Sequence, residues 1–207
     1  MFSEAKLILF FTATILMILT PGPAVIYIVA RGISQGRRSA LVSVMGIGLG
    51  NLSHAVAAAL GLSALFASSP AAYSALKYIG AAYLIYLGIR KLFSKSVAID
   101  GMPPKQESDA AVFREGLWVG LLNPKIALFF LAFLPQFATP GTSPIWLQLL
   151  ILGATFVLLG YIGDSCFALV SGTFGKWLRR HPKFANAERY ISATVYCALG
   201  VIAAVSK

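Results

Sequence analysis

The stretch Thr20-Pro21-Gly22-Pro23 interrupts the first apolar segment of this chain, which runs over residues 7–30. The segment is long enough to cross the hydrocarbon core of a bilayer, which needs ~20 predominantly apolar residues in a helix. Each proline removes a backbone donor and blocks a helical hydrogen bond. Inside a bilayer such a break persists only where the backbone is buried in protein or lines a cavity. The stretch therefore predicts a broken membrane helix beside an internal cavity.

A second break lies in the fourth apolar segment, where Asn123-Pro124-Lys125 interrupts residues 113–137. The other segments that we expect to cross the membrane are residues 40–66, 71–93, 146–170 and 187–206. Interrupted segments at corresponding places in two halves of a chain are the best pointer that a sequence offers to a transport site. We predict an all-α integral membrane protein with six transmembrane helices, of which the first and the fourth are broken.

The composition is that of a membrane protein. Hydrophobic residues make up 58% of the 207 residues and charged residues only 12%, about half the charged fraction of a soluble domain. A net charge of +10 indicates nucleic-acid binding only where the basic residues form one continuous surface. Here they are divided among separate connections, so we exclude nucleic acid as a partner.

The basic residues follow the positive-inside pattern of membrane proteins. Of the 17 Lys and Arg residues, 13 lie in or beside three connections, at residues 31–38, 90–114 and 176–189. The alternate connections, around residues 68–70 and 138–145, carry no charge. We therefore predict that the basic connections lie in the cytoplasm, where they contact anionic lipid, and that both termini are extracytoplasmic.

Residues 94–112 form a predicted cytoplasmic linker between two three-helix repeats, residues 1–93 and 113–207. The halves are similar in sequence, because KYIGAA at residues 77–82 precedes RYISAT at residues 189–194 by 112 positions. Each half has an odd number of predicted spans, so the second half crosses the membrane in the opposite sense. The sequence thus predicts a 3+3 inverted repeat with a pseudo-two-fold axis in the membrane plane.

Small residues are spaced to let helices approach closely. Gly46-x-Gly48-x-Gly50 lies in the second predicted span, and Gly116 and Gly120 lie in the fourth. A GxxxG spacing permits close contact between helix backbones in a membrane. The sequence leaves open whether these glycines form an internal contact or the face of a dimer.

The two breaks are the predicted substrate site. The helix that resumes after Pro23 presents free N–H groups and the positive end of its dipole, which suits an anionic group. The same argument applies to the helix that resumes after Pro124. We therefore predict that the residues of the breaks surround the substrate near the middle of the membrane: Pro21, Gly22, Pro23, Asn123 and Pro124.

Three further polar residues are predicted to bind the substrate: Asn51, Lys125 and Gln136. A charge at the centre of a membrane helix costs about 2.5–3.5 kcal/mol on insertion scales, so such residues are usually functional. The ammonium of Lys125 is suited to a carboxylate, and carbonyl groups freed upstream of Pro124 are expected to hold it in place. The alternative is that Lys125 extends to the membrane surface.

Asp164 and His54 are the candidates for proton coupling. Asp164 is the acidic residue that lies well inside a predicted span. A carrier that exchanges protons needs a group that gains and loses a proton within the membrane, as an intramembrane carboxyl does. Histidine changes its charge near neutral pH, although a single histidine in a helix is more often a packing residue.

Together these motifs resemble the LysE/RhtB family of amino-acid exporters, nearly from end to end of the chain. The residues that carry the resemblance are Thr20–Pro23, the glycines Gly46, Gly48 and Gly50, Tyr78–Leu84 with Leu87 and Gly88, Leu122–Lys125 and Pro135–Phe137. The resemblance implies a transporter and not an enzyme. It further implies proton-linked export of small neutral or basic amino acids, such as homoserine, threonine or lysine, from the bacterial inner membrane, often by a homodimer.

The resemblance also implies an acidic residue in the fifth span, about where this chain has Gly160. Asp164 lies one helical turn later. Residues four apart share one face of a helix, so Asp164 is the residue of this chain that matches the implied acidic position most nearly.

Other functions fit the sequence less well, and no metal site or cofactor is predicted. A divalent-metal exporter of the same superfamily needs several oxygen ligands, whereas Asp164 is alone. An intramembrane redox protein needs paired thiols, whereas Cys166 and Cys197 have no CxxC spacing. A hydrolase needs a nucleophile, a base and an acid, and Ser53 beside His54 is too weak a set, because adjacent helix residues point apart.

Overall fold

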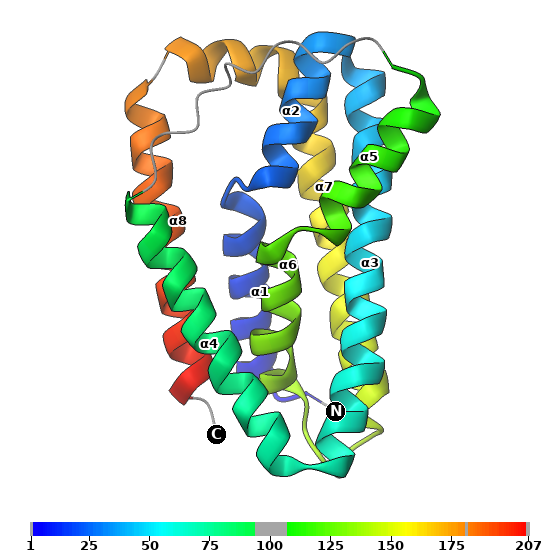
Figure 1. Cartoon of the computed structure of the whole chain (residues 1–207), viewed down its shortest axis with the longest axis vertical. Coiled ribbons are helices and arrows are strands. Elements are labelled where there is room, and N and C mark those ends of the chain that lie inside the picture. Colours follow the sequence, from blue (N-terminus) through cyan, green and yellow to red (C-terminus); the bar gives the residue numbers. More distant parts are fainter. Residues whose placement is uncertain (1, 94–106, 181, 206–207) are drawn as a thin grey trace.

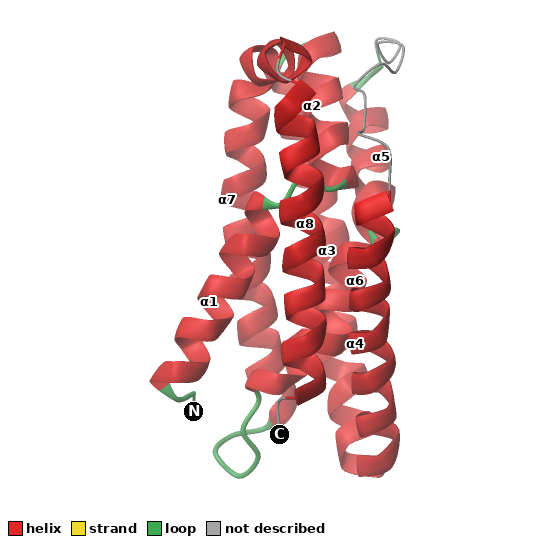
Figure 2. Ribbon diagram, turned by 90° about the vertical axis from the view of Figure 1, so that its left-hand side faces the viewer, coloured by secondary structure: helices red, strands yellow, loops and turns green. Residues whose placement is uncertain are grey.

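The computed structural model describes residues 2–93, 107–180 and 182–205, and in this part of the chain the secondary structure is helical. Figures 1 and 2 show long helices joined by short connections. In chain order they are α1 (Glu4–Leu19), α2 (Pro23–Gln35), α3 (Arg37–Ser68), α4 (Pro70–Phe93), α5 (Asp109–Leu121), α6 (Pro124–Leu128), the π-helical turn η1 (Phe129–Phe133), the 3-10 turn η2 (Leu134–Phe137), α7 (Ile145–Arg180) and α8 (Pro182–Val205).

Several helices are suited to a membrane. Within the described residues, α3 over Arg37–Ala64 and α7 over Ile145–Ser171 are each long and apolar enough to cross a bilayer. The bent pairs α1–α2 and α5 through η2 reach the same standard when each pair is taken as one span, which brings the number to four. α4 and α8 contain shorter apolar stretches, Ala81–Arg90 and Ala193–Ile202. The chain is therefore a multi-pass membrane protein, while six spans remain a prediction.

Both predicted breaks are present. α1 and α2 meet at an angle of 44°, and α5 meets the helix that starts at Pro124 at 40°. Figure 1 shows the two breaks close to the middle of the long axis. The physical reason at the first break is that Pro21 has no N–H to donate to the carbonyl of Met17, four residues earlier. At the second break, Pro124 likewise lacks a donor and begins a new helix instead of continuing α5.

The linker is shorter than predicted. Residues 94–106 lie outside the described residues, but α5 already begins at Asp109, inside the predicted linker of 94–112. The helix starts there because the side chain of Ser108 accepts a hydrogen bond from the N–H of Ala111, and because Asp109 lies at the positive end of the helix dipole.

The glycines of α3 and α5 form an internal contact. A Cβ atom on Gly50 would lie 2.7 Å from the backbone N of Leu121, and one on Gly120 would lie 2.6 Å from the carbonyl O of Ile47. Distances this short are not tolerated, so the two helix backbones touch only because these positions lack side chains. Of the two alternatives left open by the sequence, the internal contact is the one observed. This contact places the second break beside α3.

Aromatic rings fill the half of the molecule that contains α1 and η1. Phe10, Phe129, Phe133 and Phe156 belong to one buried cluster, and the rings of Phe129 and Phe156 stack with their centroids 4.5 Å apart. Such packing leaves little free space. The cluster therefore closes this half of the molecule, below the two breaks in the view of Figure 1.

An ionic network joins α2 to α5 in the other half. Arg31 is only 2% exposed, and its guanidinium donates to the Gln35 side chain (3.0 Å), to Glu107 (3.2 Å) and to Glu115. Tyr27 accepts from Arg31 at 3.2 Å and donates to Glu115 at 3.0 Å. A buried guanidinium requires such partners. The network therefore holds α2 against the first part of α5.

Candidate functional site

A cavity of about 40 Å³ lies between the two breaks. Five of the predicted site residues line it, and they come from both breaks and from two of the long helices: Gly22, Asn51, Asn123, Lys125 and Asp164. The prolines of the motifs shape the breaks instead of lining the cavity. A volume of this size holds on the order of three water molecules, so the site is small.

Lys125 points into the protein. The residue is 7% exposed, and its Nζ atom donates to the carbonyl O of Met17 at 2.6 Å and to the carbonyl O of Thr20. The Met17 carbonyl lacks a helical partner because the residue four positions later is Pro21. The carbonyl groups that hold the ammonium thus belong to the first break, and the prediction that they lie upstream of Pro124 is wrong.

Gly22 makes room for this lysine. A Cβ atom on Gly22 would lie 3.3 Å from Cδ of Lys125 and 3.8 Å from its Nζ. The φ angle of Gly22 is −129°, which any residue can adopt. The glycine is therefore needed for space and not for backbone conformation, and it lets the side chain from the second break reach the first.

The two helices that begin at the breaks are not equivalent. At α6, the side-chain carbonyl of Asn123 accepts a hydrogen bond from the N–H of Lys125 at 3.1 Å. At α2, the N-cap residue is Gly22, which has no side chain to accept such a bond. Ala24 and Val25 of this first turn line the cavity. Of these two helices, α2 is the one whose first turn both lacks a side-chain cap and lines the cavity. The sequence had predicted equal roles for the starts of α2 and α6.

Two oxygen acceptors complete the cavity. Asn51 of α3 is 7% exposed, and its Oδ1 atom has no hydrogen-bond partner among the described residues. A buried polar atom without a partner is costly and calls for an explanation. Asp164 of α7 shares one helix face with Phe156 and Gly160, which lie eight and four residues earlier and also line the cavity. The cavity therefore contains a cationic group from one half of the chain and acceptors from both halves.

Two predicted residues lie outside the cavity lining. His54 contacts the carbonyl O of Leu121 through Nε2 at 3.0 Å, so it joins α3 to the end of α5. Gln136 of η2 donates from Nε2 to the carbonyl O of Ala132 at 2.8 Å. Neither side chain is placed to contact a molecule in the cavity.

Comparison with known proteins identifies the family. The family model described as LysE type translocator matches residues 15–207. The chain belongs to this family. The chain is similar to the homoserine/homoserine lactone efflux protein of Salmonella typhimurium, with 33% identity over 93% of this chain and 92% of that protein. It is also 31% identical to an uncharacterized membrane protein of Vibrio cholerae, over 91% of each chain. No solved structure matches it.

Sequence reasoning missed two parts of this translocator's site. The carbonyl acceptor of Met17 was detectable, since it lies four residues before Pro21 and so loses its helical donor. Gly160 and Asp164 were already predicted to share one helix face, but Phe156, which lies on the same face four residues before Gly160, was missed although its spacing made it detectable. Among the described residues, no group of three or more His, Cys, Asp or Glu is arranged to hold a metal ion.

Restoring the helix at the first break of the translocator should remove its site. The double variant Pro21→Ala, Pro23→Ala supplies two backbone donors and favours the helix by up to ~3 kcal/mol per position. An N–H at residue 21 would compete with Lys125 for the Met17 carbonyl. We expect the variant to insert into the membrane and fold but to lose measurable efflux, and Pro124→Ala to behave alike. Cell efflux assays, with size-exclusion profiles of the purified variants, measure both properties.

The matched control is Pro140→Ala, because Pro140 is an exposed loop residue after η2 and lies outside the cavity lining. This variant should transport normally. Full efflux by the double variant would show that the break at Pro21 is only a packing feature.

Proposed function

We propose that the chain exports small zwitterionic amino acids in exchange for protons, with homoserine as the first candidate substrate. The observation that carries this proposal is the cavity between the two breaks, which is lined by Lys125, Asn51 and Asp164. A zwitterion needs a cationic partner for its carboxylate and acceptors for its ammonium. The name of the Salmonella typhimurium relative supports homoserine.

The substrate carboxylate is assigned to the start of α2. The first-turn N–H groups of a helix have no acceptor within the helix. In α2 the first backbone hydrogen bond runs from the N–H of Ile26 to the carbonyl O of Gly22, so the N–H groups of Ala24 and Val25 precede it. Gly22 provides no side-chain cap, and the ammonium of Lys125 lies beside it. A helix start and a cation at one point favour a carboxylate.

The substrate ammonium is assigned to Asn51 and Asp164. The Oδ1 atom of Asn51 is buried without a partner among the described residues, so a donor from the substrate would satisfy it. The carboxylate of Asp164 balances the positive charge. This arrangement supports one substrate orientation, with the carboxylate toward α2 and the ammonium toward α3 and α7.

Competition for Asp164 explains how export and proton entry are coupled in this proposal. An ionised Asp164 binds the substrate ammonium, whereas a protonated carboxyl, which has lost its charge, attracts the ammonium much more weakly. A proton that arrives from outside therefore displaces the substrate there, and loss of that proton in the cytoplasm prepares the site for the next substrate. The substrate and the proton move in opposite directions because Asp164 holds one or the other, but not both.

The proposed inverted repeat is supported by the contact between α4 and α8. A Cβ atom on Gly88 would lie 2.8 Å from the carbonyl O of Ala193, and one on Gly200 would lie 2.8 Å from the carbonyl O of Ala81. The members of each corresponding pair, Gly88 with Gly200 and Ala81 with Ala193, are 112 residues apart. Reciprocal contacts of this kind are characteristic of a two-fold axis.

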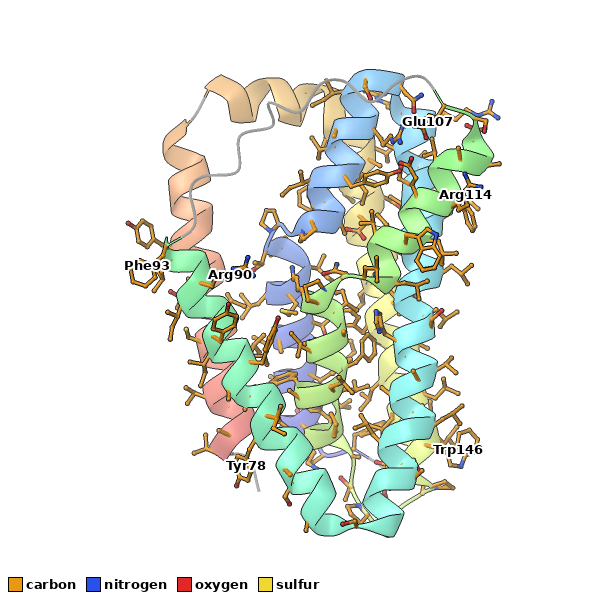
Figure 3. The ribbon with its side chains drawn as sticks, in the orientation of Figure 1. Tyr78, Arg90, Phe93, Glu107, Arg114 and Trp146 are labelled. Carbon is orange, nitrogen blue, oxygen red and sulfur yellow. The ribbon has the colours of Figure 1, made fainter. Side chains whose placement is uncertain are left out.

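We also propose that both termini are extracytoplasmic in a bacterial inner membrane. Both chain ends lie at one end of the molecule, opposite the start of α5 (Figure 1). Figure 3 shows the charged residues Glu107 and Arg114 at the α5 end, and Tyr78 and Trp146 toward the other end. Exposed Tyr and Trp are typical of a membrane interface. A homodimer, as the family resemblance implies, is part of the same proposal.

Reporter fusions test this topology. A fusion after Lys207 should report the periplasm, and a fusion within residues 94–106 should report the cytoplasm, because the basic connections favour the cytoplasmic side. Alkaline phosphatase and green fluorescent protein provide the two complementary readouts. Reports from the same compartment would overturn the topology together with the inverted repeat.

Efflux from loaded cells tests the function. Cells with and without the chain are loaded separately with homoserine, threonine, lysine or alanine, and release is followed over time. We expect the chain to accelerate release of at least one of these amino acids, and an uncoupler that removes the proton gradient to abolish the acceleration. Equal release from both strains for every amino acid would contradict the proposal.

A further inference from the structure

We propose that Gly160 determines the size of the substrate side chain that the cavity accepts. The inference rests on the proposed function and goes beyond it, because it assigns a specificity role to a residue without a side chain. It concerns the face of α7 that lines the cavity, where Gly160 lies between Phe156 and Asp164 at intervals of four residues.

Gly160 differs from other glycines on α7. A Cβ atom on Gly153 would lie 2.9 Å from the Cβ of Ala55, and one on Gly163 would overlap with the side chain of Ile18. Those glycines allow close packing. A Cβ atom on Gly160 would meet no atom within 4 Å, although this residue lies on the face of α7 that faces the protein interior.

Neither packing nor backbone conformation therefore requires glycine at this position. Gly160 is in the middle of a helix, and the glycines with a positive φ among the described residues are Gly36 and Gly141. Glycine is a poor helix former. The space beside Gly160 opens into the cavity, so a glycine at this position leaves room for a bound molecule.

The proposed orientation of the substrate directs its side chain to this space. If the ammonium binds at Asp164 and Asn51, Gly160 lies four residues away along α7, a rise of about 6 Å. That length matches a short side chain of a few heavy atoms, such as a hydroxyethyl group. The ring of Phe156 lies at the next turn and limits any longer side chain. The site is therefore built for amino acids with short unbranched side chains.

Substitution at Gly160 should change the substrate preference. We expect Gly160→Ala to lower the ratio of homoserine efflux to alanine efflux by about tenfold, the effect of a methyl-sized change in a pocket, and Gly160→Val to lower it further. Proteoliposomes containing the full chain are loaded with each radiolabelled amino acid in turn, and initial rates are compared. Gly160→Ala is the decisive variant, because alanine favours a helix more than glycine does and supports folding.

Gly61→Ala and Gly61→Val are the matched controls. Gly61 lies in α3, is exposed, and a Cβ atom there would also meet no atom within 4 Å, but it lies outside the cavity lining. These variants should keep the wild-type ratio. The inference would be overturned if the ratio of homoserine efflux to alanine efflux stayed constant in the Gly160 variants, or if it changed equally in the Gly61 variants. In either case, export by the wild type would still uphold the proposed function. Absence of export by the wild type would overturn both.

Discussion

Lys125→Met is expected to reduce efflux by at least about thirtyfold, which corresponds to ~2 kcal/mol, the lower end of the cost of removing one partner of a buried charge pair. Methionine keeps the apolar stem beside Gly22 but removes the ammonium that lines the cavity. The carbonyl groups of Met17 and Thr20 lose their donor, at about 1–3 kcal/mol for each buried acceptor left unpaired. Transport by purified protein in proteoliposomes measures the loss of efflux, and thermal unfolding in detergent measures the stability.

Two further variants separate transport from stability. Lys6→Met is the matched control, because Lys6 also donates to a backbone carbonyl, that of Ala138, at 3.2 Å but lies outside the cavity lining. It should keep normal efflux. The double variant Lys125→Met, Asp164→Asn removes both charges of the cavity, so it should be more stable than Lys125→Met and still be inactive. Normal efflux by Lys125→Met would reduce this lysine to a structural role at the end of α1.

Asp164→Asn is expected to abolish efflux driven by a proton gradient and to slow exchange of substrate for substrate without abolishing it, because the variant keeps an oxygen acceptor for the substrate ammonium but loses the negative charge. Asparagine keeps the shape of the side chain and its oxygen acceptor but cannot gain or lose a proton. Exchange between two equal pools needs no net proton movement, so the variant should still carry homoserine in both directions, at a reduced rate because the site has lost its negative charge. Proteoliposomes with an imposed pH gradient measure the first activity, and loading with unlabelled homoserine measures the second.

The control for this experiment is Asp109→Asn, which removes a carboxylate that pairs with Arg38 at the exposed start of α5. Exposed ion pairs contribute about 0–1 kcal/mol, so this variant should keep both activities. Persistence of gradient-driven efflux in Asp164→Asn would assign proton coupling to another group. Loss of both activities would show that Asp164 is needed to bind the substrate.

The site depends on an exchange of partners between the two halves of the chain. Pro21 deprives the Met17 carbonyl of its helical donor, Gly22 leaves space, and Lys125 from the second break supplies the replacement donor. The aromatic cluster closes the molecule on one side of this site, and the network around Arg31 holds α2 against α5 on the other. Opening of the molecule at the end that contains this network would require the network to separate, since it joins α2, which begins at one break, to α5, which ends at the other.

The sequence by itself determined the helical class, the membrane character and the positions of both helix breaks. These features are local. Apolar length predicts a span, and proline prevents the bond between residues four apart whatever surrounds it. The candidate residues Asn51, Lys125 and Asp164 were also predictable, because polar groups within apolar segments are expensive and therefore rare.

The tertiary structure alone decided which of these groups meet. It placed the ammonium of Lys125 on carbonyl groups more than 100 residues away, and it excluded His54 and Gln136 from the cavity lining. It also left the side-chain carbonyl of Asn51 without a partner among the residues that the structure describes. The side chain of Asn123 caps the start of α6, whereas the N-cap residue of α2 is Gly22, which has no side chain to cap that helix. Side-chain spacing along one helix specifies a face but not the neighbour of that face. The neighbour is set by packing between helices, which depends on where glycines let two backbones touch.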